Sequence, residues 1–586
     1  MDYVKLITLL CGGLAFFLYG MNVMSSGLEK MAGGKLEGML RKGTSNPFKS
    51  LALGAGITIA IQSSSAVTVM LVGLVNSGIM LLGQTVGVIM GSNIGTTLTA
   101  WILALNGVDS KGSPILSLLK PDAFSLIFAL FGIGLIMMSK KEKHHSIGSI
   151  LVGFAVLIYG MELMGNAVEP LSEMEGFKAI LTKFSNPLLG VLVGAVFTGI
   201  IQSSAASVGI LMNFASVGLI KYNMAIPIIM GQNIGTCVTA LISSIGVNKN
   251  AKRVAVVHIL FNLIGTAVFL SIYCIANSIV DFAFADQQIN AVGIAAVHSI
   301  FNICTTIMLL PFAKYLEKAA NFLVKDGKEE ETFSFIDQRL LATPSVAIAE
   351  CDRKTTEMAQ IAHKTLTNAM DLIWKYDEAL AQKVAKEEDQ LDFYEDKLGT
   401  CLVQLSSRAL SDSDSKRVSK QLHTIGDFER IGDHAVNLLV TAKEINDKQV
   451  VFSAGATAEL QVATDAIKEI VDLTVTSFAK EDLELASHVE PLEQWIDHLL
   501  ADIKARHIDR LQNGQCTIEL GFILSDILNN YERISDHCSN IAVALIETKE
   551  NAYEAHEYLN GVKQAGDPEF EAQYLHFKNK YTIKSI

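Results

Sequence analysis

Two short polar clusters lie inside long apolar segments and have the chemistry to bind a small ion. Each is a glutamine followed by two serines, at positions 62–64 and 202–204. A glutamine amide offers two N–H donors and a carbonyl acceptor, and each serine hydroxyl both donates and accepts. These groups suit an oxyanion or a small cation. Because an unpaired polar group in apolar surroundings costs on the order of a few kcal/mol, the clusters predict partners or a binding function.

A second pair of polar elements follows these clusters and could line the same cavity. Each reads Gly-x-Asn-Ile-Gly-Thr, and its glycines permit close approach of backbones. Small residues with Ser and Thr also serve plain helix packing in membranes, and this is the competing interpretation. The candidate ion-binding residues are Gln62, Ser63, Ser64, Ser65, Thr68, Asn93, Thr96, Thr97, Gln202, Ser203, Ser204, Ser207, Asn233 and Thr236.

Motifs for catalysis are missing from the sequence. No Gly-x-Ser-x-Gly turn surrounds Ser63 or Ser64, and neither a P-loop nor a His-Glu-x-x-His motif occurs. The eight cysteines show no paired spacing, so we interpret them as reduced thiols rather than as disulfides or zinc ligands. We therefore expect a protein that is not an enzyme and does not bind nucleic acid.

The polar clusters belong to a predicted membrane domain. Residues 1–330 carry 21 Lys and Arg against 16 Asp and Glu, whereas the remainder carries 26 against 44. From Leu51 to Asn106 there is no charged residue. That stretch far exceeds the roughly 20 apolar residues that cross a bilayer. The chain is predicted to hold a membrane domain over 1–325, a linker over 326–344 and a soluble remainder.

The membrane domain is an internal duplication with a constant offset of 140 residues. Four motifs recur at that offset without a gap: Tyr-Gly-Met at 19 and 159, Asn-Pro at 46 and 186, Gln-Ser-Ser at 62 and 202, and Asn-Ile-Gly-Thr at 93 and 233. The predicted repeats are about 5–110 and 145–250, with further helices over 254–312. There a shorter His-x-x-Phe-Asn element occurs at 258 and 298, for which helix packing or interhelical hydrogen bonding is the expected role.

Charge distribution predicts that the two repeats are inverted. Segment 28–49 is rich in Lys and Arg, whereas its partner 168–189 is acidic, so the positive-inside rule places them on opposite sides. An odd number of membrane crossings must then separate the two segments. This requires the Gln-Ser-Ser segments to enter and leave the membrane on the same side, as re-entrant hairpins. Interrupted segments of this kind in two inverted halves indicate a substrate site at the bilayer midplane.

These motifs resemble the sodium–phosphate cotransporter family, which includes the animal type II cotransporters, over about residues 5–312. The resemblance implies that Gln62, Ser63, Ser64, Ser65, Gln202, Ser203 and Ser204 form a phosphate and sodium site. It also implies alternating access of a transport core against a scaffold. The sequence departs from the animal pattern at Ala205, where those proteins have a third serine.

The soluble part contains long amphipathic helices and a second duplication. Glu-Arg-Ile-x-Asp-His begins at 429 and again at 532, and Glu-x-x-x-Asp begins at 388 and again at 493. In Glu-x-x-x-Asp the two carboxylates lie on one helix face. Their convergence could bind a hard metal ion; a solvated acidic face with Glu–Arg pairs is the equal alternative. The carboxylates concerned are Glu388, Asp392, Glu429, Asp433, Glu493, Asp497, Glu532 and Asp536.

This second duplication resembles the PhoU family of phosphate-uptake regulators over about 345–550. The resemblance implies two three-helix bundles, with a divalent or ferric metal on the Glu-x-x-x-Asp faces. It also supports phosphate as the substrate. The tail 551–586 is polar and carries no motif that we can interpret.

Together these features predict an all-α protein: a polytopic membrane domain of two inverted repeats with re-entrant hairpins, followed by a soluble tandem three-helix-bundle domain. The predicted function is sodium-coupled transport of inorganic phosphate across the cytoplasmic (inner) membrane, with a regulatory cytoplasmic C-terminal domain. The alternatives are a sodium-independent exporter or leak and a phosphate sensor that does not transport. The expected partners are phosphate, sodium and the lipid bilayer, and a homodimer is a candidate assembly.

Overall fold

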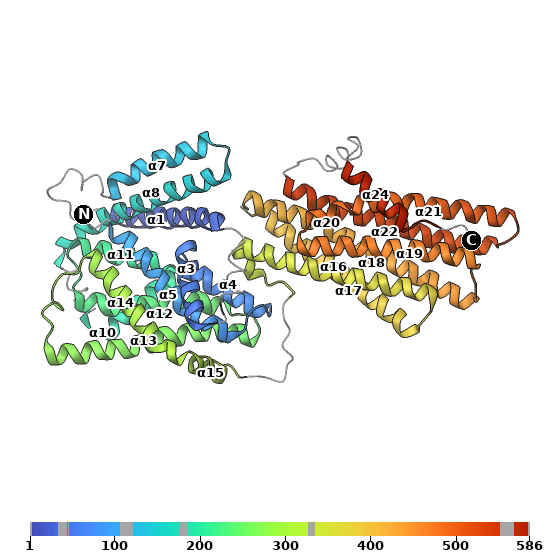
Figure 1. Cartoon of the computed structure of the whole chain (residues 1–586). Coiled ribbons are helices and arrows are strands. Elements are labelled where there is room, and N and C mark those ends of the chain that lie inside the picture. The colour runs from blue at the N-terminus through green and yellow to red at the C-terminus, as the bar shows by residue number, and fades with distance from the viewer. Residues whose placement is uncertain are drawn as a thin grey trace. The chain divides into compact units, whose positions relative to one another are not determined.

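The computed structural model describes residues 3–32, 44, 46–105, 121–175, 185–325, 335–408, 410–550 and 568–583. In these residues the secondary structure is helical, and the only β-pairing is an isolated bridge between Lys221 and Gln288. The predicted all-α class is therefore confirmed. The chain divides into two compact units, Met1–Val346 and Ala347–Ile586. Figure 1 shows the helices of both.

The N-terminal unit contains two sets of four helices in the same order. The first set is α1 (Tyr3–Ala32), α3 (Pro47–Ile61), α4 (Ser64–Asn76) and α5 (Leu82–Ala104). Each has its counterpart about 140 residues later, in α8 (Glu142–Val168), α10 (Pro187–Ile201), α11 (Ser204–Ser216) and α12 (Tyr222–Ser243). The unit also contains α7 (Pro121–Met138), α13 (Lys249–Val280), α14 (Ala291–Leu309), α15 (Ala313–Leu323) and three short 3-10 helices, η2 (Glu169–Glu173), η4 (Leu310–Phe312) and η5 (Gln338–Ala342).

Six helical segments in the described part of the chain are long and apolar enough to cross a membrane. They are Val4–Met31, Leu82–Ala104, Glu142–Leu171, Tyr222–Ser243, Lys249–Val280 and Ala291–Leu323. The four helices that flank the Gln-Ser-Ser motifs are apolar but have only 13 or 15 residues each. Much of segment 28–49, and parts of 168–189 and 326–344, lie outside the described residues.

Equivalent helices of the two repeats, α1 and α8, pack antiparallel and lie side by side (Figure 1). Glycines make this approach close: a Cβ on Gly13 would lie 2.8 Å from the carbonyl oxygen of Gly160, and one on Gly153 would lie 2.7 Å from that of Gly20. Gly13 and Gly20 correspond to Gly153 and Gly160 across the 140-residue offset. Exchanging the two repeats therefore turns one contact into the other, as expected for two helices that are related by a twofold axis.

The Gln-Ser-Ser segments fold as two helical hairpins. Asn46 and Asn186 cap the first helix of each hairpin by accepting from Phe48 N and Leu188 N, and the following proline takes the first helical position. We call α3–α4 hairpin 1 and α10–α11 hairpin 2. The recurrent Asn-Pro pair thus marks where each hairpin begins.

Hairpin 1 enters and leaves at the same end of α5. Pro47, at the start of α3, lies beside Gly87 near the start of α5, and α4 ends at Asn76, shortly before α5 begins. The tip of the hairpin reaches Thr99, near the other end of α5. This course is the one predicted for a re-entrant segment.

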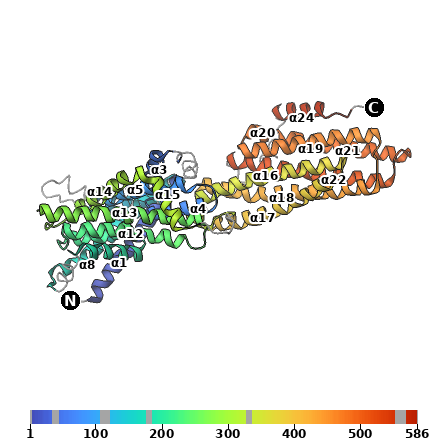
Figure 2. The ribbon, with the colours of Figure 1, turned by 90° about the horizontal axis from the view of Figure 1, so that it is seen from below.

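The C-terminal unit is built from long helices that run side by side (Figure 2). Its first group is α16 (Pro344–Trp374), α17 (Glu378–Ser406) and α18 (Asp412–Lys448). Its second group is α19 (Ala454–Lys480), the short α20 (Leu483–Ser487), α21 (Val489–Gln512) and α22 (Ile518–Glu550). The groups join through α18 and α22, and α24 (Pro568–Lys580) packs against α21.

Candidate functional site

Both Gln-Ser-Ser turns face one cavity of about 150 Å³ in the N-terminal unit. A water molecule needs about 10–15 Å³ of cavity volume, so this cavity has room for a tetrahedral oxyanion. Eight of the predicted residues line it: Gln62, Ser63, Ser64, Ser65, Thr96, Gln202, Ser203 and Ser204. The structure thus brings together two motifs that lie 140 residues apart in the sequence.

Each Gln-Ser-Ser motif performs the same two capping tasks. The glutamine ends the first helix of its hairpin in the left-handed conformation, with φ 57° at both Gln62 and Gln202. A side chain in this conformation costs about 1–2 kcal/mol, which is why glycine is more usual there. The next serine caps the second helix: Ser63 Oγ accepts from Ala66 N and Ser203 Oγ from Ala206 N, both at 3.2 Å. The N-termini of α4 and α11 therefore point into the cavity region.

The cavity also has lining residues that the sequence analysis missed. Thr99, on α5, donates to Oε1 of Gln62 at 2.9 Å. Ser25, on α1, donates to the carbonyl oxygen of Ile61, the last residue of α3. The sequence could have pointed to Thr99, because a threonine, Thr239, occupies the equivalent position in the second repeat. The other lining residues not predicted are Met21, Asn22 and Ala205.

Ala205 makes the two tips chemically unequal. It lines the cavity at the position that corresponds to Ser65 in the first repeat. Thr239 Oγ1 donates to Ser65 Oγ at 3.2 Å. Hairpin 1 therefore brings three hydroxyls to the cavity and hairpin 2 brings two.

Six predicted residues do not line the cavity; five of them bond within their own helices, and Ser207 bonds to neighbouring helices. Asn93 and Asn233 donate from Nδ2 to the carbonyls of Ile89 and Ile229, each at 2.9 Å. Ser207 accepts from Thr198 at 2.7 Å and from Gln232 at 2.9 Å. The remaining three donate to carbonyls one turn earlier in their own helices: Thr68, Thr97 and Thr236.

Electrostatically, the cavity is polar and uncharged, since none of the residues lining it is ionisable. An anion there would be held by N–H and O–H donors and by the helix N-termini. Cations would find the hydroxyl and amide oxygens, which are hard ligands. The arrangement can hold either ion, or both together.

The His-x-x-Phe-Asn elements lie inside the helix packing, and none of their residues is among those that line the cavity. His258 and His298 are fully buried, and Asn262 and Asn302 donate to the histidine carbonyls one turn earlier, at 3.1 Å and 2.9 Å. Asn262 also approaches Cys237 of α12. These contacts are of the packing kind that the sequence predicted.

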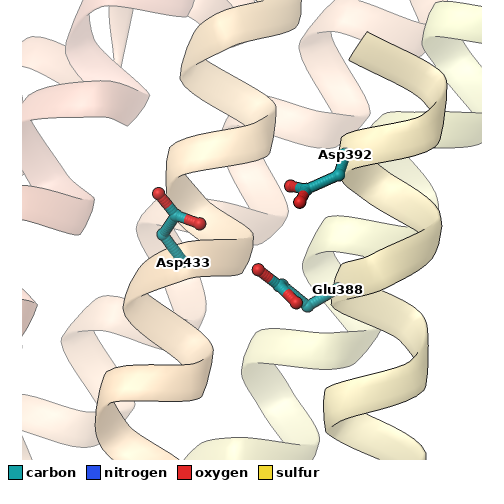
Figure 3. Close-up of side chains that lie close together, drawn as sticks. All are labelled: Glu388, Asp392 and Asp433. Carbon is teal, nitrogen blue, oxygen red and sulfur yellow. The ribbon is translucent and has the colours of Figure 1, made fainter. Parts of the chain in front are cut away.

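In the C-terminal unit, three of the predicted carboxylates come together. Figure 3 shows Glu388 and Asp392 on α17 facing Asp433 on α18. One oxygen from each lies within 4.8 Å of the others. Burial, followed by the charges of Asp433 and Asp392, raises the pKa of the neighbouring Glu429 to about 7. This concentration of negative charge could hold a hard metal ion.

The corresponding carboxylates of the second bundle are arranged differently. Lys504 pairs with Glu532 at 3.1 Å, and Arg533 pairs with Asp536 at 3.3 Å. Among the described residues, only the first set brings three such ligands within 4.8 Å. Burial and the charges of Asp536 and Glu532 nevertheless raise the pKa of Asp497.

The histidines of the duplicated Glu-Arg-Ile-x-Asp-His motif join the two bundles. The rings of His434 and His537 lie 5.6 Å apart. Nδ1 of His434 lies 2.8 Å from Asn530 Oδ1, and Nδ1 of His537 lies 2.8 Å from Asp427 Oδ1. Asp427 and Asn530 are themselves equivalent across the 103-residue repeat. The motif therefore supplies both a carboxylate of the acidic cluster and the contact between the bundles.

Comparison with known proteins assigns both units. The Na+/Pi-cotransporter family matches residues 16–166 and 156–293, and the PhoU domain matches 355–440 and 462–545. The "Putative inorganic phosphate export protein YjbB" of Escherichia coli K12 is 22% identical over 560 residues, covering 94% of this chain and 99% of that protein. YqeW of Bacillus subtilis is 28% identical over 312 residues, covering 53% and 96%.

A relative from an animal also matches. The "Sodium-dependent phosphate transport protein 2A" of Rattus norvegicus is 24% identical over 389 residues, covering 46% of this chain and 61% of that protein. The N-terminal unit of this chain therefore belongs to the Na+/Pi-cotransporter family of phosphate transporters, and its C-terminal unit carries PhoU domains.

Proposed function

We propose that this chain transports inorganic phosphate together with sodium across the cytoplasmic membrane, by alternating access to one central site. The observation that carries the proposal is the convergence of two Gln-Ser-Ser turns on one uncharged polar cavity. Phosphate would be bound by hydroxyls, glutamine amides and the N-termini of α4 and α11. Because no lining residue is a cation, a co-bound sodium ion would reduce the cost of taking the anion out of water.

The two glutamines would have different tasks in binding. The amide of Gln62 is already engaged, since Oε1 accepts from Thr99 at 2.9 Å and Nε2 donates to the Ile59 carbonyl at 2.7 Å. Gln202 is exposed, and its amide makes no hydrogen bond to the described residues. We therefore assign the amide of Gln202 to phosphate binding. Gln62 lines the site, but its amide is already hydrogen-bonded to the protein.

The antiparallel packing of α1 on α8 supports inverted repeats. If two equivalent helices cross the membrane in opposite directions, the repeats that contain them have opposite topology. Transporters of this architecture place their substrate between the halves and expose it alternately by moving one part against another. This proposal puts the C-terminal unit in the cytoplasm; the homodimer stays a prediction.

The deciding experiment is uptake of radiolabelled phosphate into proteoliposomes, with an inward sodium gradient compared with matched potassium. We expect accumulation with sodium, and its loss in Gln202→Ala and Ser203→Ala. Ser216→Ala is the matched control, because Ser216 is at the far end of α11 and bonds to the Asn213 carbonyl. Normal uptake in both site variants would refute the site assignment.

The second candidate function is sodium-independent export or leak. Its support is the name of the Escherichia coli relative, which refers to phosphate export. In the same vesicles, phosphate flux down its own gradient and indifferent to sodium would favour this alternative. A folded protein without any flux would favour a phosphate sensor.

For the C-terminal unit we propose a regulatory role that involves a divalent or ferric ion held by Glu388, Asp392 and Asp433. The proximity of their oxygens supports this proposal. Calorimetric titration with Mn²⁺ tests it: Glu388→Gln should weaken binding strongly, because a charged ligand is lost. Asp502→Asn, a change to an exposed carboxylate paired with Arg506, is the control that should leave binding unchanged.

A further inference from the structure

The chain that leads into the C-terminal unit is anchored on hairpin 1. Helix η5 packs against α4, and Leu340 is completely buried there. A Cβ on Gly73 of α4 would lie 2.8 Å from Cδ2 of Leu340, so the absence of a side chain at 73 permits the contact. We call Asp337–Ala342 the clamp segment.

A buried carboxylate fixes the clamp segment to the last residue of α4. Asp337 is 1% exposed, and its Oδ2 accepts from Asn76 Nδ2 at 2.5 Å. Arg339 supplies the countercharge: its Nη1 lies 3.1 Å from Oδ2, and its backbone N–H donates to Oδ1 at 2.8 Å. A buried charge that loses one of several partners is strongly destabilised, so these contacts hold together as a set.

Asn76 and Arg339 extend this network to the helices behind the hairpin. Asn76 Oδ1 accepts from the backbone N–H of Asn248 at 2.8 Å, and Asn248 is the N-cap of α13. Arg339 Nη2 donates to the carbonyl of Ile245 at 2.6 Å, in the turn before α13. The end of α4 is thereby fixed on two sides.

Helix α4 connects this anchor directly to the cavity. It begins at the Ser63 cap in the cavity wall and ends at Asn76, and 13 residues span roughly 20 Å. Ten of its residues are buried, so it will move as a rigid body. Hairpin 2 lacks the same anchor residues, since Asn213 and Ser216 stand where Gly73 and Asn76 stand in hairpin 1.

We infer that Asp337 and Leu340 are positioning residues, through which the clamp segment fixes α4 and links the C-terminal unit to the cavity. After Thr343 the chain continues as α16, which runs on into that unit. A displacement of the clamp segment therefore shifts the hydroxyls of Ser63 and Ser64 at the start of α4, whereas hairpin 2 lacks the residues of this anchor. The consequence for transport rests on the proposed function; the mechanical link does not.

The test compares the full-length variants Asp337→Asn and Leu340→Ala with Asp286→Asn. Asp286 is the matched control, because it forms an exposed ion pair with Lys221 at 3.4 Å in the same unit. In hydrogen–deuterium exchange, amides at the end of α4 should exchange about tenfold faster in the two clamp variants. Asp337→Asn weakens a hydrogen bond to a charged group, and Leu340→Ala removes a buried side chain that packs on α4. The KM for phosphate should also rise more than the maximal rate falls.

The outcomes separate the link from the proposed function. If the amides at the end of α4 exchange at the same rate in both clamp variants as in the Asp286→Asn control, the proposed anchoring of α4 by the clamp segment is wrong. Faster exchange with unchanged KM in an active transporter overturns the positioning role. If the wild-type chain moves no phosphate, the proposed function fails, and the exchange comparison still decides the clamp. Size-exclusion chromatography will show whether Leu340→Ala folds. If it does not, Asp337→Asn alone tests the clamp segment.

Discussion

Thr99 on α5 donates a hydrogen bond of 2.9 Å to the amide oxygen of Gln62, at the tip of hairpin 1. The same amide donates to the carbonyl of Ile59 within its own helix. Gln62 is thus fixed by one local and one tertiary contact. The corresponding Thr239 donates to Ser65 instead, so both threonines support hairpin 1.

Replacing Thr99 with valine should raise the KM for phosphate by about two- to tenfold, because a hydrogen bond contributes about 0.5–1.5 kcal/mol. The fold should survive, since valine has nearly the same shape as threonine. Concentration dependence of phosphate uptake in proteoliposomes measures the effect. Thr99→Ser keeps the hydroxyl and should behave as the wild type; an equal defect in Thr99→Ser would show that packing of the methyl group matters instead.

Substitutions of Gln202 should separate backbone strain from binding. Its φ of 57° suits glycine, so Gln202→Gly should fold at least as stably as the wild type, and Gln202→Ala should be less stable than Gln202→Gly by about 1 kcal/mol. Both variants should lose phosphate uptake, because both lose the amide. Thermal unfolding in detergent gives the order of stability. An active Gln202→Gly transporter would contradict the amide's role in binding.

Gly20 should be essential for the packing of α1 on α8. A Cβ there would lie 2.9 Å from Cα of Leu157 and closer still to backbone atoms of the facing helix. Gly20→Ala should therefore lower the unfolding free energy by about 1–3 kcal/mol, the usual cost of overpacking. Gly12→Ala, on the same helix with nothing within 4 Å of its Cβ, should be neutral or slightly stabilising. Equal melting temperatures for the two variants would refute the close contact.

The metal-free C-terminal unit should lose stability as pH rises from about 4.5 through 7. Burial and neighbouring carboxylates raise the pKa of Glu429 from 4.5 to about 7. A carboxyl whose pKa is higher in the folded state binds more protons there, so folding is favoured at low pH and this contribution is lost as the group ionises. Thermal unfolding in chelator across this range measures the slope.

Glu429→Gln should flatten that pH dependence, whereas Glu484→Gln, a change at an exposed site, should leave it as in the wild type. Added metal should reverse the loss above pH 7, because the ionised cluster is its ligand. A slope that is identical in all three proteins would show that Glu429 does not carry the effect.

Much of the organisation follows from the sequence alone, for local reasons. Hydropathy marks the helices able to cross a membrane, and the 140-residue repeat pairs their equivalents. The Asn-Pro pairs and the Gln-Ser-Ser motifs act through capping, which depends on neighbouring residues, so their chemistry can be recognised without tertiary knowledge.

Which polar side chains meet depends on the packing of helices that are distant in the sequence. Asn93 and Asn233 have suitable chemistry, yet they bond to their own helices, whereas Thr99 and Ser25 reach the hairpin tip from α5 and α1. The acidic patterns beginning at 388 and 493 look alike in sequence, but only the first gathers three carboxylates among the described residues. Spacing along a helix defines a face; what that face meets depends on how distant helices pack, and a pattern of neighbouring residues does not contain that information.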